Sequence, residues 1–159
     1  MSDAQLLSHL RRFHKAVAEG ALKLECESTL LGAIRYILAT HVEDCRQVPG
    51  FGKESSAIAR VREYLEAHYA EDVSLSELGA LTSLSPFHVA RVFSNAVGLP
   101  PHAYLESVRV RHARALLRSG VSLVDVALSV GYSDQSHFTN RFHRHTGITP
   151  GLYQRIAVS

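Results

Sequence analysis

The C-terminal half of the chain contains an internal repeat. Residues 74–85 read SLSELGALTSLS and align with 122–133, SLVDVALSVGYS, at an offset of 48 residues. Residues 93–104 read FSNAVGLPPHAY and align with 142–153, FHRHTGITPGLY, at an offset of 49. The second pair shares Phe, Gly, Pro and Tyr in the same register, which chance rarely produces. The sequence therefore predicts a duplicated structural unit.

Each copy of the repeat is predicted to form a short helix, a tight turn of three or four residues and a longer helix. A helix-turn-helix of this kind can place its second helix in the major groove of DNA. One predicted helix, 101–119, joins the two copies and is ~28 Å long at ~1.5 Å per residue. Successive major-groove faces on one side of B-DNA lie ~34 Å apart, so the spacing suits two insertions by a single chain.

The predicted fold class is all-α: two helix-turn-helix subdomains joined by a long linker helix and preceded by an N-terminal helical hairpin. Apolar residues recur with helical spacing, and no strand-like alternation is present from residue 57 onward. The helices are predicted over 3–18, 26–45, 57–69, 74–81, 85–97, 101–119, 122–130, 134–146 and 150–156. Polar residues that cap helix starts are predicted at Ser74, Ser85, Ser122 and Asp134, and left-handed caps at Gly98, Gly120 and Gly147.

The first 45 residues are predicted to form a hairpin with one apolar side. That side is carried by Leu6, Leu10, Phe13, Val17, Leu30, Ile34, Ile37, Leu38 and Val42. The hairpin has too little core to stand alone, so it packs on a second copy of itself or on the rest of its own chain. Proline and glycine in 46–56 predict a linker, which leaves 57–159 as a separate domain.

Charge is unevenly distributed along the chain. Residues 85–159 carry eight arginines against three acidic residues, whereas 57–84 carry two arginines against five acidic residues. A basic C-terminal half favours a polyanionic partner, although arginine-rich helix surfaces are common. No run approaches the ~18 apolar residues of a membrane span, and the N-terminus lacks the apolar stretch of a signal peptide. Two cysteines, Cys26 and Cys45, fit no metal spacing and favour a reducing cytoplasm.

The second helix of each unit combines an apolar stripe with a polar row. In 134–146, Phe138 and Phe142 are predicted to pack inward, which leaves Ser136, His137, Asn140 and Arg144 outside. By the repeat, Phe87, His88 and Arg91 correspond to Ser136, His137 and Asn140. Arginine can pair with guanine, asparagine with adenine, and an aromatic ring can contact the thymine methyl group. The polar row therefore suits the reading of base edges; the alternative is an ordinary solvated surface.

The sequence resembles the AraC/XylS family of bacterial transcription regulators. The family's signature is carried by 121–155, VSLVDVALSVGYSDQSHFTNRFHRHTGITPGLYQR. The first unit, VSLSELGALTSLSPFHVARVFSNAVGLPPHAYL at 73–105, and RVRHARALL at 109–117 fit it as well. The resemblance covers about 57–156. It implies two helix-turn-helix subdomains that bind adjacent major grooves of double-stranded DNA beside a promoter, with contacts to RNA polymerase, in the bacterial cytoplasm.

The resemblance also implies roles for individual positions. The family's base-reading places fall on Phe87, Ala90, Arg91, Ser136, His137 and Asn140. Candidate phosphate contacts are Ser85, His88, Arg111, Ser133, Gln135 and Arg144. Ala90 offers at most an apolar contact, and Asn140 stands where many relatives have arginine, which implies an altered base preference. In the first unit Gly79 replaces the usual alanine and Ser83 the usual turn glycine, which predicts a less rigid unit.

Most relatives place a β-barrel sensor before the DNA-binding part, and the 56 residues that precede residue 57 here are too few for one. The hairpin resembles the helical segment that follows the sensor and mediates dimerisation, so a homodimer through residues 3–45 is expected. The chain is either a fragment of a longer regulator or a short version without a sensor. No site for a small-molecule effector is assigned to it.

Two other classes of function compete with DNA reading. An enzyme is not expected, because His143 and His145 point to different helix faces and no phosphate loop, His-Glu-x-x-His or nucleophile motif occurs. No catalytic residue, cofactor or metal is predicted. The remaining alternative is an interaction module that dimerises with a full-length relative and modulates it without reading DNA. Binding of DNA by the isolated chain separates these two.

Overall fold

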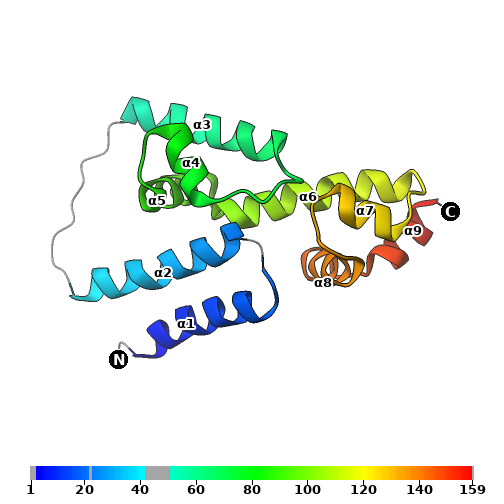
Figure 1. Cartoon of the computed structure of the whole chain (residues 1–159), viewed down its shortest axis with the longest axis horizontal. Coiled ribbons are helices and arrows are strands. Elements are labelled where there is room, and N and C mark those ends of the chain that lie inside the picture. The colour runs from blue at the N-terminus through cyan, green and yellow to red at the C-terminus, as the bar shows by residue number, and fades with distance from the viewer. Residues whose placement is uncertain (1–2, 22, 42–50, 159) are drawn as a thin grey trace. The chain divides into compact units, whose positions relative to one another are not determined.

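The computed structural model describes residues 3–21, 23–41 and 51–158. Within these ranges the chain forms nine helices and no strand, so the predicted all-α fold is confirmed (Figure 1). The helices are α1 (Asp3–Ala18), α2 (Lys23–His41), α3 (Phe51–Ala67), α4 (Leu75–Thr82), α5 (Pro86–Val97), α6 (Pro101–Arg118), α7 (Leu123–Ser129), α8 (Gln135–Thr146) and α9 (Pro150–Val158). In the same ranges, none of these helices is long and apolar enough to cross a membrane.

The predicted caps of the helix-turn-helix units are confirmed. Each N-cap side chain accepts a hydrogen bond from the backbone N–H three residues further on, and these caps are Ser74, Ser85, Ser122 and Asp134. Gly98 and Gly147 end α5 and α8 with φ angles of 78° and 81°, a conformation that glycine adopts without strain. Local sequence signals therefore determine where both candidate recognition helices begin and end.

The third helix begins earlier than the sequence predicts. α3 starts at Phe51 rather than at residue 57, so residues 51–56 of the predicted linker are helical. Glycine and serine weaken the helical pattern there, but Glu54 lies in the first turn, where its charge complements the helix dipole. α2 likewise starts at Lys23 rather than at residue 26. Residues 42–50, with the rest of the predicted linker, lie outside the described ranges, and the division into 1–45, 46–56 and 57–159 stays a prediction.

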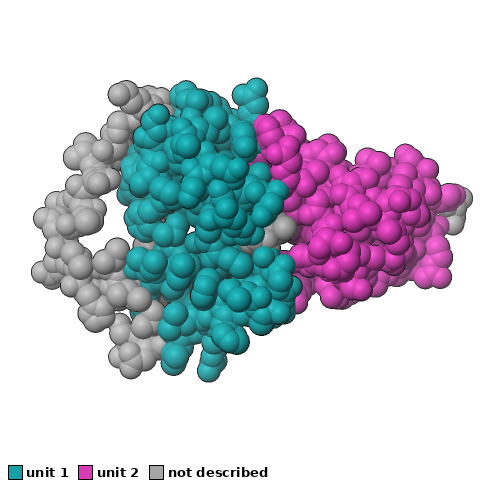
Figure 2. All heavy atoms as spheres, in the orientation of Figure 1, with its two compact units in different colours: residues 1–64, 72–103 teal, residues 65–71, 104–159 magenta. Residues whose placement is uncertain are grey.

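The chain divides into two compact units (Figure 2). Unit 1 comprises residues 1–64 and 72–103, and unit 2 comprises residues 65–71 and 104–159. Unit 1 therefore contains the hairpin α1–α2, most of α3, and the first helix-turn-helix, α4–α5. Its buried apolar side chains include Leu24, Val61, Leu75, Leu78, Val89 and Phe93. Unit 2 contains most of α6, the second helix-turn-helix, α7–α8, and α9.

Unit 2 is built around a row of aromatic rings. Phe138 and Phe142 of α8 are completely buried, as predicted from their spacing. Their ring centroids lie 5.6 Å apart, and the same distance separates Phe142 from Tyr153 of α9. Tyr132 continues the row at 5.5 Å from Phe138. Aromatic pairs attract at these distances, so the row fixes the inward face of α8.

Arg109 is an arginine in the core of unit 2, and its side chain is completely buried. Its Nε donates to the Tyr69 carbonyl at 2.6 Å, its Nη2 to the Glu71 carbonyl at 2.9 Å and its Nη1 to the Gly131 carbonyl at 3.0 Å. The guanidinium also lies 5.4 Å from the centroid of the Tyr132 ring, a favourable cation–π distance. Arg109 is therefore no part of the basic surface that the charge distribution predicts, because its donors are used inside the unit.

The two N-terminal helices pack against each other as a hairpin, as predicted. Ala16, Leu24 and Ala33 are buried in it, and the His9 ring lies 5.5 Å from the Tyr36 ring. Part of the predicted apolar side remains exposed, namely Leu10, Val17, Leu30 and Ile34. Phe13, which also belongs to the predicted apolar side, is partly buried. The other predicted side chains lie outside the described part of the chain; they are Leu6, Ile37, Leu38 and Val42.

Candidate nucleic-acid interface

In unit 2, α8 presents a polar row to solvent. Ser136, Asn140 and Arg144 are exposed, while His137 is partly buried. Ser136, Asn140 and Arg144 follow one another at intervals of four residues, which places them on one face of the helix. Since the aromatic row holds the opposite face, side chains that can pair with base edges project from a helix with a fixed position.

His137 is held by two neighbouring side chains. Arg141 Nε donates to His137 Nε2 at 3.3 Å, and the Tyr132 ring meets the imidazole edge-on at 5.4 Å. Because Nε2 accepts in this arrangement, the ring hydrogen lies on Nδ1.

The N-terminus of α8 is surrounded by exposed polar side chains, among them the candidate phosphate contacts Ser133 and Gln135. Asp134 accepts hydrogen bonds from the His137 backbone N–H at 2.8 Å and from the Ser133 hydroxyl at 3.1 Å. The His137 N–H first, and the Ser133 hydroxyl second, stabilise the ionised carboxylate and so lower the pKa of Asp134. A helix N-terminus favours anions, and here the Asp134 carboxylate already occupies one of its N–H groups.

We expect Asp134→Ala to destabilise unit 2 at neutral pH and to reduce its sensitivity to acid. The folded pKa lies below the unfolded value of ~3.9, so the ionised carboxylate contributes stability above that value. This contribution is lost as the pH falls through the lower, folded pKa. Urea denaturation of both proteins near neutral pH and in acid measures the effect. A stability difference between them that stays constant with pH contradicts this role for Asp134.

In unit 1, the equivalent residues of α5 are less accessible. Phe87, Ala90 and Arg91 are all partly buried, and no hydrogen-bond partner for the buried Nε of Arg91 is described. Arg91 Nη2 lies 3.3 Å from His88 Nδ1, and His88 Nε2 lies 3.0 Å from a carboxylate oxygen of Glu54 on α3. A guanidinium only donates, so Nδ1 accepts and Nε2 carries the hydrogen that His88 donates to Glu54. Glu54 thus orients His88, which in turn holds one end of Arg91.

Two further candidate phosphate contacts already have partners within the chain. Ser85 accepts a hydrogen bond from the His88 backbone N–H, and Arg111 forms an ion pair with Glu66. Partial burial acts to raise the pKa of Glu66, but hydrogen bonds from Tyr104 and Arg111 outweigh it and lower that pKa overall. The Arg111 side chain is nevertheless 61% exposed. An ion pair as exposed as this one contributes little, so Arg111 can turn to a phosphate at small cost.

Glu54 and Glu66 were not found by sequence reasoning. Glu66 lies on the predicted helix 57–69 and Glu54 in the predicted linker 46–56, and neither position carries a signal that connects it to the site. Their partners His88 and Arg111 lie 34 and 45 residues further along the chain. Hydrogen bonds at such separations follow from tertiary packing, which helical periodicity does not encode.

The turn of the first unit departs from that of the second at two linked positions. Ser83 ends α4 in the left-handed region with a φ of 58°. A Cβ atom at Gly79 would lie 2.8 Å from the carbonyl oxygen of Leu84. Glycine at position 79 therefore lets the turn pass close to α4, which is a steric role. The lower rigidity that the sequence predicts for this unit stays a prediction.

Comparison with known proteins agrees with this architecture. Residues 78–156 match the model of a helix-turn-helix domain. An uncharacterised HTH-type transcriptional regulator of Bacillus subtilis (strain 168), YbfI, is 35% identical over 133 residues, which is 84% of this chain and 48% of that protein. The crystal structure of a probable AraC family transcriptional regulator from Rhodopseudomonas palustris CGA009 is 30% identical, with a TM-score of 0.59, and the match covers 65% of this chain and 99% of that chain. The DNA-binding domain of AdpA, solved in complex with a target DNA, is 26% identical, with a TM-score of 0.59 over 63% of this chain and 91% of that chain.

The chain belongs to the AraC family of helix-turn-helix transcriptional regulators. The resemblance inferred from the sequence motifs is thereby confirmed. The chain spans 48% of the length of the Bacillus relative, and 13% of an uncharacterised HTH-type transcriptional regulator of Staphylococcus aureus (strain COL) that is 33% identical over 98 residues.

Proposed function

We propose that this chain reads the sequence of double-stranded DNA with α5 and α8, which enter two adjacent major grooves near a bacterial promoter. The observation that carries the proposal is the exposed row Ser136, Asn140 and Arg144 on a helix whose other face is buried through Phe138 and Phe142. A helix that reads a groove needs polar side chains at the base edges and a scaffold that holds them in place. The complex of the AdpA domain with its target DNA supports the same use of this fold.

The proposed base-reading residues are Phe87, Ala90 and Arg91 of α5 and Ser136, His137 and Asn140 of α8. Arg91 pairs with guanine, Asn140 with adenine, and Phe87 contacts a thymine methyl group. The proposed phosphate contacts are Ser85, His88, Arg111, Ser133, Gln135 and Arg144. Phosphate contacts set the register of the protein on the duplex, whereas base contacts carry the sequence preference.

The proposal also covers location and protein partners. A regulator that reads chromosomal DNA works in the bacterial cytoplasm, and one that binds beside a promoter contacts RNA polymerase. A homodimer through residues 3–45 is supported by the exposed apolar side chains of Leu10, Val17, Leu30 and Ile34. In this account the chain acts by binding alone, with no catalytic step and no cofactor.

We expect Arg91→Ala to cost about 1–3 kcal/mol of binding free energy on a selected site and to relax the preference at one base position.

Arg144→Ala should instead weaken binding to all sequences alike. Because one phosphate contact is lost, the slope of the logarithm of the binding constant against the logarithm of the salt concentration should become shallower by about 0.9. Fluorescence anisotropy titrations at several salt concentrations measure both quantities. Equal affinity of wild type and Arg91→Ala for the selected site removes Arg91 from the base-reading set.

The second candidate is an interaction module that pairs with a full-length relative and modulates it without reading DNA. The exposed apolar side chains of the hairpin fit this function as well as they fit a homodimer. Direct binding of a selected duplex by the purified chain decides between the two.

A further inference from the structure

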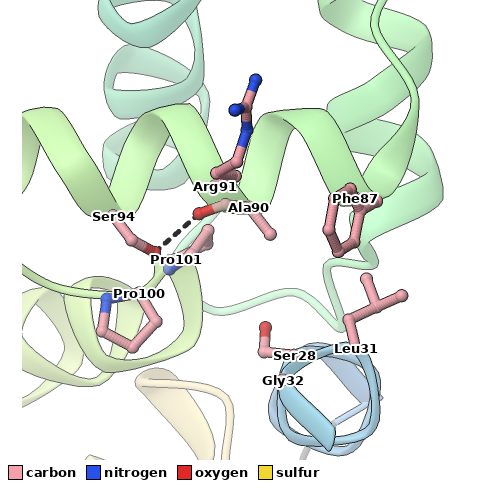
Figure 3. Close-up of a pocket in the computed structure, with 9 residues that line it drawn as sticks. All are labelled: Ser28, Leu31, Gly32, Phe87, Ala90, Arg91, Ser94, Pro100 and Pro101. Atoms are coloured by element: carbon pink, nitrogen blue, oxygen red, sulfur yellow. Dashed lines mark hydrogen bonds between the residues drawn. The ribbon is translucent and has the colours of Figure 1, made fainter. Parts of the chain in front are cut away.

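The candidate base-reading face of α5 is covered by α2 (Figure 3). Phe87, Ala90 and Arg91 line a pocket together with Ser28, Leu31 and Gly32 of α2. The side chains of Phe87 and Leu31 point toward one another, while the Arg91 side chain points away from α2. We propose that α2 holds the first helix-turn-helix closed, and that DNA must displace α2 before α5 can enter the groove. This inference rests on the proposed function, because it requires α5 to read DNA.

The repeat provides an internal comparison for this cover. α5 and α8 are both 12 residues long; each has an N-cap side chain, Ser85 or Asp134, that accepts a hydrogen bond from the backbone N–H three residues further on, and each has a glycine at the C-cap. Ser136 and Asn140 of α8 are exposed, whereas their equivalents Phe87 and Arg91 are partly buried. α2, which belongs to unit 1, supplies Ser28, Leu31 and Gly32 to the pocket that Phe87 and Arg91 also line. The cover therefore comes from α2, which lies outside the repeat, and is not inherent in the helix-turn-helix.

A second contact attaches α2 to the other helix of the same motif. A carboxylate oxygen of Glu27 accepts a hydrogen bond from the Leu75 backbone N–H at 2.6 Å. Leu75 is the first residue of α4, and the N–H groups at a helix N-terminus have no partner within the helix. Glu27 and Leu31 are four residues apart, so one face of α2 contacts both helices.

The Glu27 carboxylate occupies a position that also suits a DNA phosphate. The first helix of a helix-turn-helix crosses the DNA backbone, and a helix N-terminus is an anion-binding site. Glu27 therefore places an anion at the N-terminus of α4, while Leu31 meets Phe87 on α5. α2 contacts the motif with the same two kinds of group, an anion and an apolar group, that DNA offers as phosphate and thymine methyl.

The contact between α2 and α5 is less well packed than a protein core. A pocket of about 170 Å³ that is open to solvent lies at this contact, and Pro100 and Pro101 also line it. The hydroxyl oxygen of Ser28 is buried with no hydrogen-bond partner among the described residues, which opposes closure. The open pocket and the buried Ser28 hydroxyl leave this contact incompletely packed, so it favours a cover that exchanges for DNA over a permanent part of the core.

The test compares the DNA affinity of full-chain variants that weaken this contact. Leu31→Asp places a carboxylate against Phe87, and its matched control Leu152→Asp places the same charge on an exposed leucine of α9, outside residues 3–45. If the open form makes up about a tenth of the wild type, Leu31→Asp binds the selected duplex about tenfold more tightly than the control. Glu27→Gln tests the contact at α4 with a change that leaves the helix sequence otherwise intact. Its control is Glu25→Gln, and we expect tighter binding of the duplex for Glu27→Gln only.

The position of α2 can be followed directly by nuclear magnetic resonance. A nuclear Overhauser contact between the Leu31 methyl groups and the Phe87 ring reports the closed form and should disappear when DNA is added. The proposal is overturned if this contact persists in the DNA complex, or if Leu31→Asp and Glu27→Gln bind no more tightly than their controls. Circular dichroism shows whether a variant remains folded; if Leu31→Asp does not, the Glu27→Gln pair decides.

Failure of this inference and failure of the proposed function give different results. If Arg91→Ala weakens binding but Leu31→Asp and Glu27→Gln change nothing, α5 reads DNA and the cover by α2 is wrong. If Arg91→Ala has no effect even in the Leu31→Asp background, α5 does not read DNA, and the proposed function of this helix falls together with the inference.

Discussion

Replacement of Arg109 by alanine should destabilise unit 2 by at least about 3 kcal/mol. The carbonyl groups of Tyr69, Glu71 and Gly131 would lose their donor, and each buried acceptor without a partner costs ~1–3 kcal/mol. The Tyr132 ring would also lose its cation–π contact. Because Gly131 belongs to the turn between α7 and α8, loss of Arg109 loosens the attachment of the second recognition helix. Urea denaturation of the two proteins measures the change in the free energy of unfolding.

Arg118→Ala is the matched control for this substitution. Arg118 lies in the last turn of the same helix and is exposed. Its loss removes only a favourable interaction with the helix dipole, so the expected cost is below about 1 kcal/mol. If Arg109→Ala lowers the free energy of unfolding no more than Arg118→Ala does, the three hydrogen bonds of Arg109 do not stabilise unit 2 as proposed.

Gly131→Ala should have the second largest effect on the stability of unit 2. Gly131 has a φ of 84°, and an added Cβ atom would lie 2.7 Å from the carbonyl carbon and 2.8 Å from the Cα of Ala70. Positive φ costs about 1–2 kcal/mol for an L-residue. The clash adds about 1–3 kcal/mol, because backbone cannot move aside as a side-chain tip can. To relieve the clash, residues 70 and 131 would have to move apart, which would separate the Glu71 and Gly131 carbonyl groups that Arg109 joins.

Gly147→Ala separates the two contributions. Gly147 has a φ of 81° and no atom within 4 Å of an added Cβ, so its replacement costs only the backbone strain. We expect Gly131→Ala to lower the free energy of unfolding by about 1–3 kcal/mol more than Gly147→Ala. Equal effects of the two substitutions in urea denaturation contradict the close approach of residues 70 and 131.

The fold of the two helix-turn-helix units could be predicted from local signals in the sequence. Ser85 and Asp134 mark the starts of α5 and α8, and Gly98 and Gly147 mark their ends. Each signal acts within one turn of helix, where the backbone N–H and C=O groups need caps. The repeat adds the register between the two copies, and the four-residue spacing of Phe138 and Phe142 correctly predicted that both are buried.

The contacts that join distant segments could not be predicted. Arg109 binds carbonyl groups 40 and 22 residues away, and Glu27 caps a helix 48 residues further along. A charged residue on a helix is most often solvated, so the sequence favours exposure for both. Only the packed structure shows that the donors of Arg109 meet backbone acceptors, and that Glu27 meets a helix N-terminus.

The accessibility of the candidate site also lay beyond sequence reasoning. The spacing predicts Phe87 and Arg91 on the outer face of α5, where the helix itself places them. α2 packs against Phe87, whereas the Arg91 side chain is held through His88 and Glu54 of α3. The sequence left two packing choices open for α2. The described contacts of α2 with α4 and α5 fit packing on its own chain, and the exposed apolar side chains of the hairpin leave room for a second copy.

Selection of random DNA duplexes on the purified full chain, followed by sequencing of those retained at moderate salt, tests the central claim most directly. If α5 and α8 both read DNA, the retained duplexes share two short boxes about 10.5 base pairs apart, centre to centre. A single box contradicts the claim for one of the two helices. No enrichment by a chain shown to be folded contradicts DNA reading altogether.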